Sequence, residues 1–174
     1  MISGYLQSGK DTVANYLVKE YKYKRLAFAD ILKDDVSKIY SIERQLLDTT
    51  EGKKNFNTVY KKSNRQILID HGCDKRKIDP NYWVDKVIDK LKNTKENYVV
   101  SDWRFENEYN RIKEKTREKI ITIRINRFDK SDINDISETS LDNFNFDYTL
   151  SNKGTIDELY TKVRELVIFF VNNK

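Results

Sequence analysis

The sequence predicts an α/β fold in which a central, mostly parallel sheet carries helices on both faces. Short apolar runs, at residues 25–28, 97–102, 120–125 and 148–150, alternate with segments of helical periodicity. Strands that alternate with helices form parallel sheets, because each helix carries the chain back to the end of the sheet where the previous strand began. A length of 174 residues fits one domain, so residues 1–174 are treated as a single unit.

The first half of the chain has several helical patterns. After the turn at Gly9, apolar residues follow the i, i+3, i+4, i+8 spacing of an amphipathic helix, and a second stripe occupies residues 31–40. Residues 64–70 are also expected to be helical and to end at Gly72. The polar and basic residues 49–63 are expected to form a loop.

The second half contains clearer helix boundaries. Asp79 is expected to cap a helix with Pro80 in its first position, where the missing N–H is not needed. The charged residues 106–115 form the next predicted helix. The last helix begins with a capping box of Thr155 and Glu158, in which each side chain satisfies a backbone N–H of the first turn.

Composition excludes several classes of protein. Hydrophobic residues make up 38% and aromatic residues 12%, and 33 basic against 28 acidic residues leave a net charge of only +5, so a disordered chain is not expected. No run of about 18 apolar residues is present, so we expect no membrane partner. The sequence shows no secretory leader and one cysteine, Cys73, which favours a cytoplasmic protein.

Residues 4–10 have the spacing G-x-x-x-x-G-K of a phosphate-binding loop that opens a helix. Glycines let backbone N–H groups turn inward around a polyphosphate, and Lys10 adds a point charge. Asp11 stands where the common pattern has Ser or Thr, and a carboxylate beside a triphosphate implies an intervening Mg²⁺. A glycine-rich turn with a solvated lysine is the alternative. The residues assigned to the donor phosphates are Gly4, Gln7, Ser8, Gly9, Lys10, Asp11 and Thr12.

Charged residues also follow the other predicted strands, at the sheet edge where such folds bind ligands. Asp102 is predicted to hold Mg²⁺ together with Asp11, and Arg104 to grip a phosphate with two hydrogen bonds. A surface salt bridge is the alternative for this pair. Asp30 and Lys33 follow an earlier strand, where Asp30 either contacts the acceptor or caps a helix.

Two further segments are assigned by their position between strands. Residues 42–95 are predicted to receive the acceptor phosphate, and Arg65 and Arg76 there either bind it or lie on the surface. Residues 126–140 are predicted to form a lid from which Arg127 stabilises the transferred group, with a solvated loop as the alternative. His71 is expected at a helix end, without a partner that would mark a metal site.

Five blocks of the sequence together resemble the viral and bacteriophage-type deoxynucleoside monophosphate kinases. The blocks are Ser8-Gly9-Lys10-Asp11-Thr12; Phe28-Ala29-Asp30 with Lys33; Arg65-Gln66 through Asp79-Pro80-Asn81-Tyr82-Trp83-Val84; Ser101-Asp102-Trp103-Arg104-Phe105-Glu106-Asn107-Glu108; and Ser137-Glu138, Leu141, Asp147-Tyr148 and Asn152-Lys153-Gly154-Thr155. The resemblance implies the P-loop kinase fold, and transfer of the terminal phosphoryl group of ATP to a deoxynucleoside monophosphate with Mg²⁺.

The resemblance also implies roles for individual residues. The implied catalytic residues are Lys10, Asp102, Arg104 and Arg127. Asn152 and Gly154 would bind the adenine end of ATP. The implied acceptor residues are Asp30, Lys33, Arg65, Arg76, Trp83 and Arg104. Relatives suggest a homodimer without a nucleic-acid partner, located in the host cytoplasm if the protein is viral.

Three alternatives remain open at this point. The nearest is a kinase of the same fold that acts on another small phosphate acceptor, since phosphomevalonate kinases share the G-K-D loop and similar later motifs. A non-catalytic nucleotide-binding protein is disfavoured by the joint presence of Asp102, Arg104 and Arg127. A nucleic-acid-binding module would suit the pI of about 9.1, but both charge signs are mixed along every predicted helix.

Overall fold

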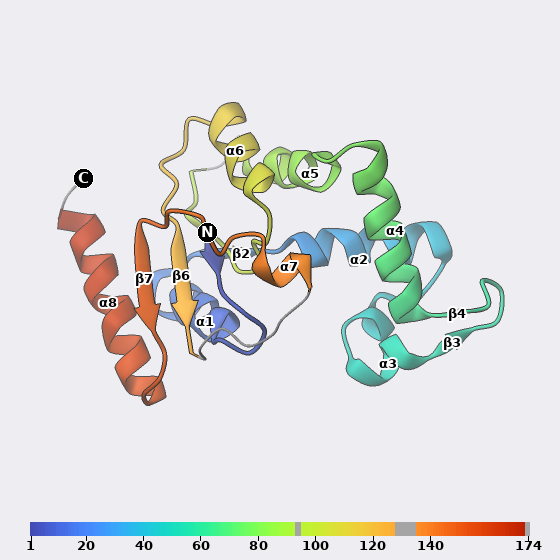
Figure 1. Cartoon of the computed structure of the whole chain (residues 1–174), viewed down its shortest axis with the longest axis horizontal. Helices are drawn as coiled ribbons and strands as arrows, with labels where there is room; N and C mark the ends of the chain where they lie inside the picture. The colour runs from blue at the N-terminus through green and yellow to red at the C-terminus, as the bar shows by residue number, and fades with distance from the viewer. Residues whose placement is uncertain (93–94, 128–134, 173–174) are drawn as a thin grey trace.

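A computed structural model describes residues 1–92, 95–127 and 135–172 (Figure 1). It has the predicted mixed α/β architecture with parallel pairing. Strands β1 (Ile2–Ser3), β6 (Ile123–Asn126) and β7 (Tyr148–Ser151) pair in parallel in the order β1-β6-β7. Strands β2 (Lys24–Leu26) and β5 (Tyr98–Val100) form a second parallel pair, and β3 (Phe56–Asn57) and β4 (Lys62–Ser63) form an antiparallel hairpin.

Helices connect these strands. In chain order they are α1 (Lys10–Tyr21), α2 (Phe28–Tyr40), the 3₁₀ helix η1 (Arg44–Leu47), α3 (Thr50–Lys54), α4 (Asn64–Ile78), α5 (Tyr82–Leu91), α6 (Glu106–Lys115), α7 (Ile136–Thr139) and α8 (Ile156–Asn172). In the part of the chain that the structure describes, no helix combines the length and the apolar character that a bilayer crossing needs.

Helices cover both faces of strand β5, because its adjacent residues point into two different cores. Val99 packs with Val13 of α1 and Leu159 of α8, whereas Val100 packs with Trp83 of α5 and with residues of α2 and α6. Successive side chains of a strand alternate between its faces. The two clusters therefore lie on opposite sides of the strand, as the predicted fold requires.

A third apolar cluster stabilises a side lobe, made of η1, α3, β3, β4 and α4. Val36 of α2 packs there against Leu47 and Ile67, and all three are almost fully buried. Figure 1 shows the side lobe at the opposite end of the molecule from α8. The lobe lies within the segment that the sequence assigned to the acceptor.

The structure corrects two predicted features of this lobe. Residues 49–63 are not a plain loop: Thr49 accepts a hydrogen bond from the N–H of Gly52 and so caps α3, and the β3–β4 hairpin follows. Helix α4 does not stop at Gly72 but continues to Ile78. A Cβ at Gly72 would lie 3.3 Å from Cδ2 of Leu32, so this glycine allows α4 to approach α2 closely instead of ending the helix.

The starts of helices α5, α2 and α8 can be compared with the predicted ones. Helix α5 begins at Tyr82, not at Pro80, because the carboxylate of Asp79 accepts the N–H of Asn81 at 2.8 Å and stabilises a turn before the helix. Helix α2 begins at Phe28, which shortens the strand expected at residues 25–28. The capping box of the last helix is confirmed, since Thr155 and Glu158 exchange two backbone-to-side-chain hydrogen bonds of 3.3 Å.

Candidate active site

The loop between β1 and α1 closes around the side chain of Lys10. Its Nζ donates hydrogen bonds to the carbonyl oxygens of Gly4, at 2.6 Å, and of Tyr5, at 2.7 Å. Gly9 has a φ of 104°, and a Cβ at this position would lie 2.5 Å from Nδ2 of Asn152. Only glycine fits such backbone without strain. The loop is therefore a compact turn wrapped around one cation at the start of α1.

The electrostatics of Lys10 are those of a desolvated cation. Burial lowers the pKa of its ammonium group, and the charges of Arg104 and Arg124 lower it further, while Glu138 and Asp11 oppose the shift. The charges of three cations thus act at this place, where Arg104 is paired with Glu138 and Arg124 with Asp142. An anion with several oxygens that bound there would be attracted by all three cations.

Ser8 and Asn152 complete the inner side of the loop. The amide of Asn152 is buried and donates to the carbonyl oxygen of Ser8 at 2.8 Å. The sequence assigned Asn152 to the adenine end of ATP, but here its amide fastens β7 to the loop; Gly154, assigned with it, is exposed. The Oγ of Ser8 is buried, and within the described residues it has no hydrogen-bond partner.

Arg104 is held beside the loop by α7. Its Nη1 donates to the carbonyl oxygen of Ser137 at 3.1 Å and forms an ion pair with Glu138. Its backbone carbonyl accepts the hydroxyl of Ser140. Glu138 also accepts the N–H of Leu6 at 2.7 Å and so links Arg104 to the loop. Arg104 therefore lies near the loop, as predicted. The link between them is the carboxylate of Glu138, to which the sequence analysis gave no role.

Arg124 is a second arginine at this site and, unlike Arg104, it is buried. Its guanidinium lies 4.6 Å from the ring centre of Tyr5 and donates to Asp142 at 2.9 Å. The sequence analysis gave the lid role to Arg127 instead. Arg127 follows β6 and is exposed, and residues 128–134 of the predicted lid lie outside the described residues.

The two carboxylates predicted to hold Mg²⁺ have other partners. Both oxygens of Asp102 accept backbone N–H groups of α2, from Phe28 at 3.0 Å and Ala29 at 2.8 Å. Asp102 therefore caps α2 from the neighbouring strand, and burial raises the pKa of its carboxyl despite these two bonds. Asp11 is mostly exposed and faces Arg25 at 3.6 Å.

In this structure the carboxylates of Asp11 and Asp102 are engaged by Arg25 and by backbone N–H groups of α2. Across residues 1–92, 95–127 and 135–172, no three acidic, histidine or cysteine side chains are arranged to bind a metal ion. Arg25, which the sequence analysis treated only as part of a strand, is placed between Asp11 and Asp30 and makes a 2.9 Å ion pair with the latter. Its guanidinium supplies part of the positive charge that the prediction assigned to Mg²⁺.

The predicted acceptor residues are divided among three environments. Lys33 pairs with Asp30 at 3.3 Å and with Asp48 at 2.9 Å. Arg65 is exposed on α4, and Arg76 lies over the ring of Phe105. Trp83, which was predicted to contact the acceptor, is a core residue in the structure.

The burial of Trp83 excludes the predicted contact with an acceptor. The side chain is 2% exposed, and its Nε1–H donates to the carbonyl oxygen of Gly72 at 3.1 Å. His71, expected at a helix end, lies inside α4, where it is buried and pairs with Asp35 at 3.1 Å. Both side chains stabilise the packing of α4 on its neighbours.

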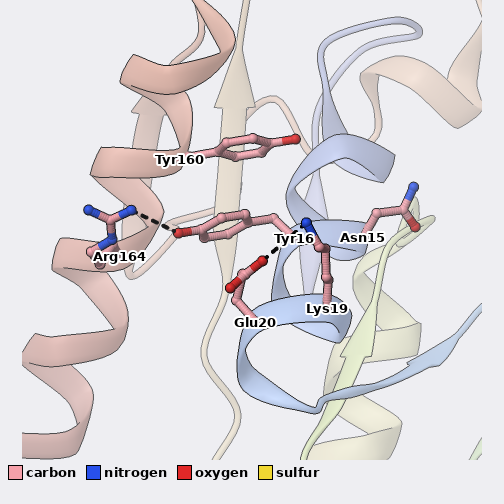
Figure 2. A pocket seen from close by; sticks show the side chains of 6 residues that line it. All are labelled: Asn15, Tyr16, Lys19, Glu20, Tyr160 and Arg164. Atoms are coloured by element: carbon pink, nitrogen blue, oxygen red, sulfur yellow. Dashed lines mark hydrogen bonds and ion pairs between the residues drawn. The ribbon is translucent and has the colours of Figure 1, made fainter.

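A separate hollow of about 350 Å³ lies on the surface between α1 and α8 (Figure 2). Its lining residues are Asn15, Tyr16, Lys19, Glu20, Tyr160 and Arg164. The rings of Tyr16 and Tyr160 stack with centroids 4.3 Å apart, and Arg164 reaches the hydroxyl of Tyr16. None of the predicted site residues lines this hollow, so it is not part of the candidate active site.

A buried lysine in a glycine-bounded loop, at the start of a helix and beside arginines, is the arrangement with which parallel α/β enzymes bind the phosphates of a nucleotide. The mixed α/β fold with parallel strand pairs is consistent with this class of enzyme. A sequence model of the family described as phosphomevalonate kinase matches residues 2–120, which is more than half of the chain. The chain belongs to the phosphomevalonate kinase family.

This match agrees with the nearest alternative of the sequence analysis better than with a deoxynucleoside monophosphate kinase. It covers the loop, Asp102 and Arg104, and ends before β6. No curated protein matches the chain.

Proposed function

We propose that the protein is an ATP-dependent kinase that transfers the terminal phosphoryl group of ATP to the phosphate of a small acceptor, with 5-phosphomevalonate as the favoured acceptor. The observation that carries this proposal is the buried Nζ of Lys10, enclosed by the loop and flanked by two arginines. Membership of a kinase family supports it.

The protein needs to contribute little covalent chemistry to this reaction. The attacking atom is an oxygen of a phosphate that is already ionised at pH 7, so no strong general base is required. Negative charge spreads over the transferred group in the transition state. Lys10, Arg104 and Arg124 would neutralise that charge from fixed positions, which is the largest contribution that such a site can make.

The side lobe offers cations for the other end of an acceptor. Burial lowers the pKa of Lys53, and the charges of Lys33 and Arg65 lower it further, while Asp48 opposes the shift. The sequence analysis missed Lys53, which is one of several lysines in an unremarkable polar segment. 5-Phosphomevalonate carries a carboxylate besides its phosphate, and a cluster of cations suits a second negative group.

A deoxynucleoside monophosphate is the second candidate acceptor. The five sequence blocks favour it, and the last of them lies beyond the residues matched by the family model. The burial of Trp83 weakens this candidate, because no face of the indole is open to a base. We retain Mg²⁺ as the expected companion of ATP, without assigning it to side chains.

A coupled assay of ADP release separates the candidates. The purified protein is supplied with ATP and Mg²⁺, and with 5-phosphomevalonate, each of the four deoxynucleoside monophosphates, each of the four ribonucleotides, or dephospho-coenzyme A. We expect rapid release with 5-phosphomevalonate. Release with a deoxynucleotide alone would replace the favoured acceptor, and no release above the rate without acceptor would refute a kinase for these substrates.

A further inference from the structure

The carboxylate of Glu138 binds two of the groups that a phosphate would use. Its Oε2 accepts the backbone N–H of Leu6 in the loop at 2.7 Å, and its Oε1 forms the ion pair with Arg104. The side chain is only 11% exposed. Its charge also acts on Lys10, since it raises the pKa that burial lowers. A single anion thus interacts with the loop amide, the arginine and the lysine.

Each of these three groups donates hydrogen bonds and accepts none. Lys10 donates to the carbonyl oxygens of Gly4 and Tyr5, so the groups that need an anion in the ligand-free protein are the N–H of Leu6 and the guanidinium of Arg104. A carboxylate is the protein group closest to a phosphate oxygen pair in charge and geometry. Glu138 therefore partners the N–H of Leu6 and the guanidinium of Arg104 in the ligand-free protein.

The helix that carries Glu138 can move at small cost. Helix α7 spans Ile136–Thr139 and buries none of its four residues, so its displacement exposes little apolar surface. Immediately after it, Leu141 is 1% exposed and Asp142 is bonded to Arg124. These two residues fix the chain behind α7, whereas α7 itself is held mainly by polar contacts with Arg104 and Leu6, which an incoming anion can replace.

We propose that Glu138 is a built-in competitor of the donor triphosphate: it occupies the loop amide and Arg104 until ATP displaces it. This inference rests on the proposed function, because the displaced ligand is the polyphosphate of that same site. The affinity for ATP is then lower than the loop alone would provide. When ATP binds, its triphosphate replaces the carboxylate of Glu138 at the loop, and α7 moves away from the loop in the same step.

The same ion pair has a second explanation, in which Glu138 only positions Arg104 for catalysis. The two explanations make opposite predictions for binding. If Glu138 competes with the triphosphate, removing its charge makes the triphosphate bind more tightly. If Glu138 only positions Arg104, removing its charge leaves the affinity for the triphosphate unchanged or lowers it. A gain in affinity is also a result that partial unfolding would not produce.

The test is the variant Glu138→Gln, studied by isothermal titration calorimetry at fixed ionic strength with ATP and with inorganic tripolyphosphate. Glutamine keeps an oxygen for the N–H of Leu6 but loses the charge that holds Arg104. We expect both ligands to bind about tenfold more tightly than to the wild type, because a charge-assisted hydrogen bond no longer competes. The control is Glu165→Gln on α8, an equal change of charge at an exposed residue, which should leave both affinities unchanged.

A second variant keeps the charge and guards against a folding defect. Glu138→Asp shortens the side chain by one methylene group, so its carboxylate reaches Leu6 and Arg104 less well, and affinity should rise by less than in Glu138→Gln. Circular dichroism checks that each variant is folded. Equal or weaker binding by both folded variants overturns the inference and leaves the kinase proposal intact, provided that the wild type binds ATP. If neither the wild type nor Glu138→Gln binds ATP or tripolyphosphate, the inference and the proposed function both fall.

Discussion

The loop around Lys10 and the side lobe both concentrate charge, but their charged side chains differ in burial and in partners. Around the loop, Lys10 and Arg124 are buried, and their surroundings include groups from distant parts of the chain, such as Asp142 on Arg124. At the side lobe, Arg44 pairs with Asp34 and Asp48, which are close to it in sequence and stay about half exposed.

This difference predicts at which positions the removal of a charge should change function or stability most. Charges that are removed from water interact strongly, because little solvent screens them. Exposed ion pairs contribute little, since water and salt screen them and ordering long side chains costs entropy. Substitutions at the loop should therefore have large effects on function, and substitutions of the exposed pairs should have small effects on stability.

The largest expected effect is the loss of Lys10. We expect Lys10→Ala to lower kcat by at least about a hundredfold, the size of a typical loss of one preorganised electrostatic contact. The coupled ADP-release assay measures it. The control is Lys19→Ala, which removes an 83% exposed lysine from the same helix and should change kcat less than about twofold. Unchanged turnover by a folded Lys10→Ala protein would contradict the assignment of the loop.

Asp102 provides the next largest effect, on stability. Asp102→Ala leaves the N–H groups of Phe28 and Ala29 without their acceptor, so we expect the free energy of unfolding to fall by about 2 kcal/mol. Urea unfolding without Mg²⁺ measures this loss. Asp102→Asn keeps one oxygen and should lose about half as much. If Asp102 serves only a metal ion, neither variant will change stability under these conditions.

The third prediction concerns how protein stability depends on pH through the buried carboxyl group of Glu108. Burial raises the pKa of its carboxyl to about 7, although the N–H groups of Arg104 and Phe105 favour the charged form. A folded-state pKa above the unfolded value means that the contribution of Glu108 to stability is fully present below pH 4.5 and is lost as the pH rises through 7.

Glu108→Gln removes this titration and keeps an acceptor for the two N–H groups. Relative to the wild type, we expect the variant to gain about 1.5 kcal/mol in the free energy of unfolding between pH 5 and pH 8. Urea unfolding midpoints across this range measure it. Parallel pH profiles of the two proteins would show that Glu108 does not titrate there.

The smallest effect is expected at the side lobe. Hydrogen bonds from Arg44 and Lys33 lower the pKa of Asp48 to about 2, so its contribution to stability is present above the unfolded pKa near 4 and is lost as the pH falls toward 2. Because Asp48 is half exposed, Asp48→Asn should cost less than about 1 kcal/mol at pH 7, and less again at pH 3 or in high salt. A loss above about 2 kcal/mol in urea unfolding would break the comparison between the two regions.

Sequence reasoning recognised the loop around Lys10, because its signal is a spacing of neighbouring residues. It placed Asp102 correctly at the end of a strand but assigned it to a metal. An acid in that position looks the same whether a cation or a helix start lies opposite, and here the N-terminus of α2 lies opposite. It named Glu138 within a block but gave it no role, since nothing in the local pattern indicates that Leu6 is its partner.

By itself, the sequence indicated the mixed α/β class, a kinase and the position of the loop, because periodicity and spacing are properties of short stretches of chain. Only the tertiary structure decided which charges meet. Glu138 reaches a backbone N–H that lies 132 residues away, and Asp102 reaches one that lies 74 residues away. Those pairings follow from the parallel arrangement of the strands and the helices packed on them, which brings distant residues together at one edge.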